Sequence, residues 1–168
     1  IKWTEKARPG YYAQDHSEDF KSETSLPEWV ADYARANAGD GEDMETLIRD
    51  TLGRVLFSGD DVKKAVRVIS GGEQGRMIFG KLMLMKPNVL ILDEPTKGVD
   101  IGAKAESYRI ISELAAKGVA VLVISSELPE VIGMSDRIMV IHEGHLAGII
   151  DHKDATQTRI MTLATGGE

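Results

Sequence analysis

Two short segments of the chain combine residue types that can act on an anion. The first is Ser70-Gly71-Gly72-Glu73-Gln74, which stands where a helix is expected to begin. Glycines allow a ligand to approach the backbone closely, and the free N–H groups of a helix N-terminus attract phosphate groups. The same residues also fit a glycine-containing turn with a polar cap. Taken alone, the segment leaves both interpretations open.

The second segment is an apolar run that ends in two carboxylates, Asp93 and Glu94. Open α/β sheets bind ligands at the carboxyl ends of their strands, where Asp93 could hold a hydrated Mg²⁺ ion. Glu94 could orient and polarise a water molecule that attacks a terminal phosphate. Both side chains can reach one cleft because they follow the end of the strand. The alternative is that they only cap the next element.

Hydrophobic periodicity and glycine or proline breaks predict the elements that must position these residues. The expected order is a strand at 10–14, a helix opened by Pro27, helices at 42–56 and from Gly71 to Pro87, the apolar strand before Asp93, a helix at 103–117, a strand at 119–124, a helix at 128–133, strands at 137–142 and 146–150, and a helix from about Lys153. This alternation indicates an α/β domain with a largely parallel sheet and a hairpin at its edge. The apolar strand before Asp93 is expected to be buried on both faces.

The composition narrows the class of protein. The 168 residues include 27 acidic and 20 basic side chains, and 42% of them are hydrophobic. The sequence contains no cysteine, which excludes disulfides and thiolate metal sites. No apolar run approaches the roughly 20 residues of a membrane helix. The net charge of −7 argues against indiscriminate nucleic-acid binding. Thirteen acidic and four basic residues lie between Asp15 and Asp61, which favours a solvated surface over an acidic docking site. Because the chain opens at Ile1 without Met or a signal peptide, it is expected to be a piece of a longer protein.

The segment ISGGEQGRMIFGKLMLMKPNVLILDEPT closely resembles the signature helix and Walker B strand of the ATP-binding cassette (ABC) ATPases. The resemblance extends over essentially the whole chain. It implies an α/β, P-loop NTPase-like fold with a mostly parallel sheet and a helical subdomain, incomplete at the N-terminus. The implied division is residues 1–14 as the end of the core strands, 15–69 as the helical subdomain, and 70–168 as the signature helix, Walker B strand, D-loop and C-terminal core.

The resemblance also implies ATP and Mg²⁺ as cofactors and a role for each matching residue. Glu94 matches the catalytic glutamate, and Asp93 and Gln14 match the Mg²⁺ ligands, partly through water. The other implied nucleotide contacts are the signature residues Ser70, Gly71 and Gly72, the D-loop acid Asp100, and Ser126 at the position of the switch histidine.

Three departures limit what the resemblance carries. The 168 residues contain no Walker A loop, because the one Gly-Lys pair, Gly80-Lys81, lies inside the predicted signature helix. The loop is expected upstream of Ile1, so the chain alone is expected to bind ATP weakly or not at all and to be inactive or nearly so. Loss of the strand before that loop would leave apolar sheet faces exposed and favour self-association.

The second departure is Ser126, which replaces the switch histidine, and the third is Ile69, which replaces the usual leucine of the signature.

The resemblance divides by subfamily near Pro95. Residues 1 to about 96, including GYYAQDH, look like the second cassette of an ABC-F protein, a class that acts on ribosomes. Residues from about 95 onward resemble the second cassette of ribose, xylose and galactose importers, in which Ser-Ser-Glu at the switch position is normal. The implied partners are a second cassette, with membrane permease subunits for an importer or the ribosome for an ABC-F protein, and without direct membrane insertion.

Carbohydrate import is the preferred function, in the cytoplasm or peripheral at the inner face of the plasma membrane. The alternatives are an ABC-F translation ATPase and a non-catalytic fragment that completes another cassette's ATP site.

Overall fold

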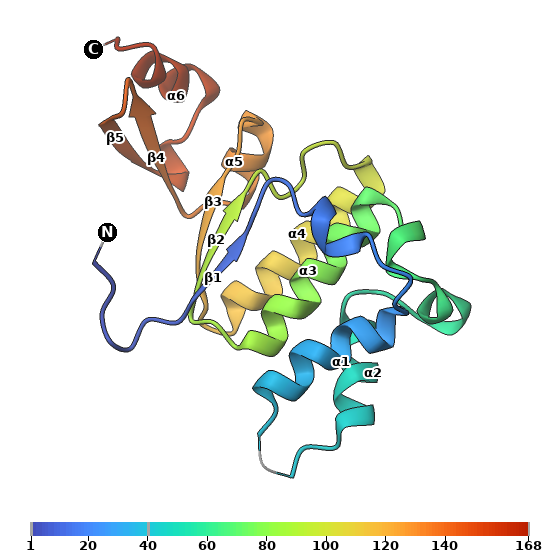
Figure 1. The fold of residues 1–168 in the computed structure, drawn as a ribbon. Coiled ribbons are helices and arrows are strands. Elements are labelled where there is room, and N and C mark those ends of the chain that lie inside the picture. Colours follow the sequence, from blue (N-terminus) through green and yellow to red (C-terminus); the bar gives the residue numbers. More distant parts are fainter. Residues whose placement is uncertain (1, 40, 168) are drawn as a thin grey trace. The chain divides into compact units, whose positions relative to one another are not determined.

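The computed structural model describes residues 2–39 and 41–167 (Figure 1). They form two compact units, which divide between Ile124 and Ser125 and are described separately. Within the described ranges, no helix combines the length and the apolar character needed to cross a membrane.

A three-stranded parallel sheet forms the centre of the first unit. It consists of β1 (Pro9–Tyr12), β2 (Val89–Asp93) and β3 (Ala120–Ile124), with β2 in the middle. In this register Tyr11 lies opposite Ile91, which lies opposite Leu122. The parallel strands and the intervening helices confirm the predicted α/β class.

Two helices cover one face of this sheet, α3 (Gly71–Met85) and α4 (Ile101–Ala116). Leu90 and Leu92 of β2 point to this face and are fully buried. The opposite face is open: Tyr11 is 58% exposed, Leu122 47% and Ile124 48%. Among the described residues of the first unit, helices cover one face of the sheet only, so the prediction that β2 is buried on both faces is wrong for this unit. Exposed apolar surface on the sheet is also predicted by the sequence analysis.

A helical layer lies beside α3 in the first unit. It contains α1 (Leu26–Asn37), α2 (Met44–Arg54) and three short 3₁₀ turns, η1 (Ser17–Phe20), η2 (Gly59–Lys63) and η3 (Val66–Val68). Ser25 and Glu28 form a capping box at the start of α1, with Pro27 in the first turn. The Asp43 side chain accepts a hydrogen bond from the Thr46 N–H, so α2 begins two residues later than predicted. These elements occupy the segment expected to be the helical subdomain.

The second unit contains α5 (Leu128–Met134), β4 (Arg137–His142), β5 (His145–Asp151), the 3₁₀ turn η4 (His152–Asp154) and α6 (Gln157–Ala164). Ile138, Val140, Ile150 and Ile160 form its core. Among the described strands, β4 and β5 pair only with each other, so the prediction of a hairpin at the edge of the parallel sheet is wrong. The last helix begins at Gln157 rather than near Lys153, because the Thr156 side chain caps it there.

Candidate functional site

A small polar cleft of about 170 Å³ lies at the carboxyl end of the parallel sheet. It brings together three of the predicted site residues, Gln14, Gly71 and Glu94. The other lining residues are Tyr12, Asp15, His16, Ser17, Gln74, Pro95, Lys97, Gly98 and Val99. Residues from three distant parts of the sequence therefore meet where α/β sheets bind their ligands.

Gln14 reaches the cleft because it follows the end of β1, two residues after Tyr12. The Tyr12 hydroxyl donates a hydrogen bond to the Pro95 carbonyl at 3.3 Å and thus ties the end of β1 to the segment after β2. The Tyr12 ring packs against Phe79 of α3, with 5.1 Å between ring centroids. Burial raises the pKa of the Tyr12 hydroxyl above its ordinary value of 10.

Ser70 caps the N-terminus of α3, as one of the two sequence interpretations required. Its hydroxyl oxygen accepts a hydrogen bond from the Glu73 N–H at 3.3 Å, and the Glu73 carboxylate accepts one from the Ser70 N–H at 2.7 Å. Lys64 also donates to this carboxylate, at 3.1 Å. Partial burial opposes ionisation of Glu73, but these hydrogen bonds outweigh it and lower its pKa. The capping geometry leaves the hydroxyl hydrogen of Ser70 able to donate to a ligand.

The two signature glycines have different surroundings. A Cβ added at Gly71 would meet no heavy atom within 4 Å, so this position is open toward the cleft. A Cβ added at Gly72 would lie 2.8 Å from the Ala103 Cβ and 3.4 Å from a Val99 methyl carbon. Gly72 is therefore required for packing between α3 and α4, whereas no neighbouring atom restricts the side-chain position at Gly71.

Glu94 adopts a left-handed backbone conformation, with φ of 48°. Such a conformation is uncommon for a residue with a side chain and costs about 1–3 kcal/mol. The Glu94 N–H donates to the Ile124 carbonyl at 2.8 Å, and its carbonyl accepts from the Lys97 N–H at 3.1 Å. These backbone contacts hold the strained conformation in which Glu94 lines the cleft.

Asp93 ends β2 on the open face of the sheet. One of its carboxylate oxygens, Oδ2, accepts a hydrogen bond from the Tyr11 hydroxyl at 3.1 Å. This hydrogen bond raises the pKa of Tyr11, because it stabilises the protonated phenol beside a negative charge.

The oxygen donors in this region fit Mg²⁺ in the way that the ion is usually held in nucleotide sites. Among residues 2–39 and 41–167, no group of three or more His, Asp or Glu side chains could hold a metal ion. Mg²⁺ keeps several of its waters and commonly takes only one or two carboxylates together with substrate phosphates. One carboxylate, Asp93, and one side-chain amide, Gln14, are compatible with that mode.

The remaining predicted residues do not line the cleft. The Asp100 carboxylate caps α4 by accepting from the Ala103 N–H at 3.0 Å. Ser126 lies in the bend before α5, in the second unit. There the neighbouring Ser125 hydroxyl donates to the buried Glu130 carboxylate. Neither observation tests a nucleotide contact by these residues.

The sequence analysis does not predict the hydrogen bonds of Tyr11 with Asp93 and of Tyr12 with Pro95. The pair Tyr11-Tyr12 was interpreted only as part of a β-rich strand. A parallel pairing of β1 with β2 would have indicated both contacts, since adjacent residues of a strand point to opposite faces.

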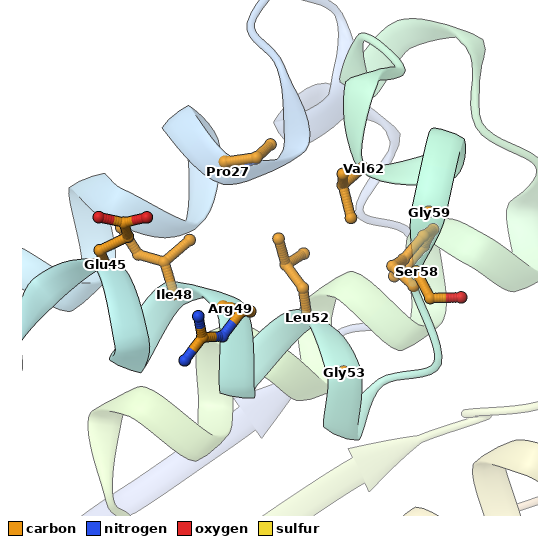
Figure 2. Close-up of a pocket in the computed structure, with 10 residues that line it drawn as sticks. Pro27, Glu45, Ile48, Arg49, Leu52, Gly53, Ser58, Gly59 and Val62 are labelled. Atoms are coloured by element: carbon orange, nitrogen blue, oxygen red, sulfur yellow. The ribbon is translucent and has the colours of Figure 1, made fainter.

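A larger apolar pocket, of about 700 Å³, lies in the helical layer (Figure 2). Ile48, Leu52 and Val62 project into it, and Glu45 and Arg49 of α2 lie at one side. Pro27, Gly53, Phe57, Ser58 and Gly59 complete the lining. Its size and apolar lining are typical of a ligand or partner site.

Comparison with known proteins places these features in a family. Residues 2–97 match the model of the ABC transporter family. The chain is 51% identical over 126 residues to a putative ribose/galactose/methyl galactoside import ATP-binding protein of Burkholderia cenocepacia, covering 75% of this chain and 23% of that protein. A protein of the same description from Ralstonia nicotianae is 59% identical over 124 residues, covering 74% of this chain and 23% of that protein.

The likeness to importers also reaches the N-terminal half. The ribose import ATP-binding protein RbsA of Lactococcus lactis subsp. cremoris is 39% identical over 170 residues, covering 97% of this chain and 34% of that protein. The chain thus spans between about a quarter and a third of these relatives. Among solved structures, the dimeric, ADP- and phosphate-bound post-hydrolysis state of the ATP-binding cassette MJ0796 has a TM-score of 0.70. It is 16% identical and covers 87% of this chain and 63% of that chain, which shows the shared fold.

Proposed function

Because the chain belongs to the ABC transporter family, we propose that it is part of a cassette that hydrolyses Mg-ATP to drive carbohydrate import. The observation that carries this proposal is the cleft in which Gln14, Gly71 and Glu94 meet. The sugar-import names of the relatives support carbohydrate as the transported class. The proposed location is the inner face of the plasma membrane.

Each predicted site residue, within the cleft or outside it, has a proposed task. Asp93 and Gln14 would supply oxygen ligands to the Mg²⁺ ion, which would neutralise part of the negative charge on the phosphates of ATP. The Glu94 carboxylate orients the attacking water and accepts its proton. The Ser70 hydroxyl and the Gly71 N–H would donate to the terminal phosphate held by a second cassette, and Asp100 would cross the interface with that cassette. Ser126, at the switch position, would contact a terminal phosphate. Positioning of the reactants and stabilisation of the charge on the transferred phosphoryl group provide most of the rate enhancement.

A Glu94→Gln substitution in the assembled importer tests the catalytic role. Turnover of ATP should fall about 100-fold or more, whereas ATP binding should persist, because the amide keeps the shape and loses the base. The control is Glu113→Gln on the exposed side of α4, which should leave turnover unchanged. Unchanged turnover in Glu94→Gln would instead favour the accessory role, in which Ser70, Gly71 and Gly72 complete the ATP site of another cassette.

We expect the 168-residue chain by itself to bind Mg-ATP weakly, because its sequence contains no Walker A loop. That loop supplies the backbone cradle for the phosphates in P-loop proteins. Calorimetric titration with Mg-ATP should show no micromolar binding. A micromolar dissociation constant would show that the residues in this chain suffice for the nucleotide site.

The apolar pocket of the helical layer is the proposed contact with a membrane permease subunit. Apolar side chains of a permease segment would enter between Leu52 and Val62, with polar groups near Glu45 and Arg49. Replacing the half-buried Ile48 by Glu should weaken co-purification of the permease by about tenfold. Val68→Glu is a suitable control, because Val68 is 56% exposed and does not line the pocket. Equal losses in both variants would contradict this contact.

The ABC-F alternative depends on the sequence of residues 1–96, in particular GYYAQDH. Sedimentation with ribosomes in the presence of a slowly hydrolysed ATP analogue distinguishes it from import. Binding that is stoichiometric and ATP-dependent would favour the translation role, and permease association without ribosome binding would favour import.

A further inference from the structure

Two consecutive tyrosines bracket the end of β2 from opposite faces of the sheet. Tyr11 points to the open face, where its hydroxyl donates to Asp93 Oδ2 at 3.1 Å. Tyr12 points to the covered face, where its hydroxyl donates to the Pro95 carbonyl at 3.3 Å. The residues immediately before and after Glu94 are therefore each held by a phenol from β1.

The sheet register makes the Tyr11 contact a fixed feature rather than a chance approach. Tyr11 lies opposite Ile91, and Asp93 lies two residues further along β2, so both side chains project from the same face. A tyrosine ring is long enough to reach diagonally across neighbouring strands. Tyr11 is 58% exposed, so burial does not determine the orientation of its ring.

We propose that Tyr11 is a positioning residue that holds Oδ2 of the Asp93 carboxylate and so presents the other oxygen, Oδ1, to the divalent cation. This inference rests on the proposed function, in which Asp93 is a metal ligand. A carboxylate whose orientation is fixed by a hydrogen bond loses less rotational freedom when it binds a metal. Partners that orient metal ligands in this way typically contribute 10- to 100-fold to metal affinity.

Tyr12 provides a matched control, because Tyr12→Phe removes the same atom one residue away. It deletes a hydrogen bond to a carbonyl on the covered face and leaves the Asp93 carboxylate with its Tyr11 partner. The two variants therefore separate orientation of Asp93 from general loosening of the segment around Glu94.

The probe is Mn²⁺, which replaces Mg²⁺ at oxygen sites and broadens nearby NMR signals. In the 168-residue chain labelled with ¹³C at the tyrosine Cζ, four signals are expected, since the sequence has four tyrosines. Mn²⁺ should broaden the Tyr11 signal first, and Asp93→Asn should abolish this selectivity. The Asp93-dependent Mn²⁺ affinity should fall about tenfold in Tyr11→Phe and stay within about twofold of the unsubstituted chain in Tyr12→Phe.

The outcomes separate the two proposals. Equal Mn²⁺ affinity in Tyr11→Phe and the unsubstituted chain overturns the role of Tyr11 and leaves the metal role of Asp93 intact. Equal losses in both tyrosine variants also overturn it, since they would reflect general loosening. Absence of any Asp93-dependent Mn²⁺ binding contradicts the proposed metal ligand and the inference together. Circular dichroism checks the fold of each variant, and the exposed position of Tyr11 favours retention of structure.

Discussion

The two faces of the β1–β2–β3 sheet differ in what they contribute. The covered face carries Leu90 and Leu92, which are fully buried beneath the helices. The open face carries Tyr11 and Asp93 together with exposed apolar side chains such as Leu122. Stability thus comes from one face, whereas the Tyr11–Asp93 hydrogen bond and the exposed apolar surface belong to the other. Substitutions that act on one face alone can test this division.

The largest effect is expected from Leu92→Ala on the covered face. Removing a fully buried leucine side chain should lower the free energy of unfolding by about 2–5 kcal/mol, because it leaves a cavity against α3 and α4. The matched change on the open face, Leu122→Ala, should cost less than about 1 kcal/mol, since Leu122 is 47% exposed. Urea denaturation followed by circular dichroism measures both. Similar losses would show that the open face is covered in solution.

The two signature glycines should differ in the same way, with a smaller effect on stability: the packed Gly72 should be sensitive to substitution and the open Gly71 should not. Gly72→Ala should destabilise the chain by about 1–3 kcal/mol, because its Cβ would lie 2.8 Å from the Ala103 Cβ. Gly71→Ala should change stability by no more than about 0.5 kcal/mol, since nothing lies within 4 Å of its added Cβ. Thermal unfolding of the two variants provides the comparison. A larger loss for Gly71→Ala would contradict the distinction between a packed and an open glycine.

The start of α3 should contribute a smaller, pH-dependent stability. The Glu73 pKa lies below its ordinary value of 4.5, so ionised Glu73 stabilises the folded chain above that pH. The stabilisation is lost as the pH falls through the lowered folded-state pKa. Glu73→Gln should therefore reduce the unfolding temperature at pH 7 and have a progressively smaller effect as the pH falls below 4.5. A difference that stays constant with pH would show that the charge of Glu73 is not involved.

The smallest change in stability, within about 0.5 kcal/mol, is expected for Leu122→Lys on the open face. Its main effect should be on association, because the open face exposes Leu122 and Ile124 on β3, an edge strand of the described sheet. Sedimentation velocity over a range of concentrations should show less self-association for this variant than for the unsubstituted chain. An unsubstituted chain that stays monomeric at high concentration would show that this surface does not drive association.

The sequence predicts best those features that depend on neighbouring residues. The start of α3 follows from Ser70 and Glu73, and the start of α1 from Ser25, Pro27 and Glu28, because these residues cap and constrain the first turn locally. The carboxylates at the end of β2 were likewise identified from the apolar run before them.

Features that depend on distant residues could not be predicted in the same way. The apolar run of β2 indicates burial, but it does not say which side of the strand another element covers. The Tyr11 contact with Asp93 joins residues 82 positions apart and requires the register between β1 and β2. The difference between Gly71 and Gly72 depends on where α4 packs, which no local pattern encodes.

The left-handed backbone at Glu94 costs conformational stability at the position of the proposed catalytic carboxylate. Glycine would adopt φ of 48° without a steric penalty, so Glu94→Gly should relieve strain while it removes the carboxylate. A laboratory selection for thermal tolerance alone would therefore tend to discard this side chain. Engineering a more stable cassette should exclude position 94 from the randomised set, because under the proposed catalytic role of Glu94 a gain in stability there would lower turnover.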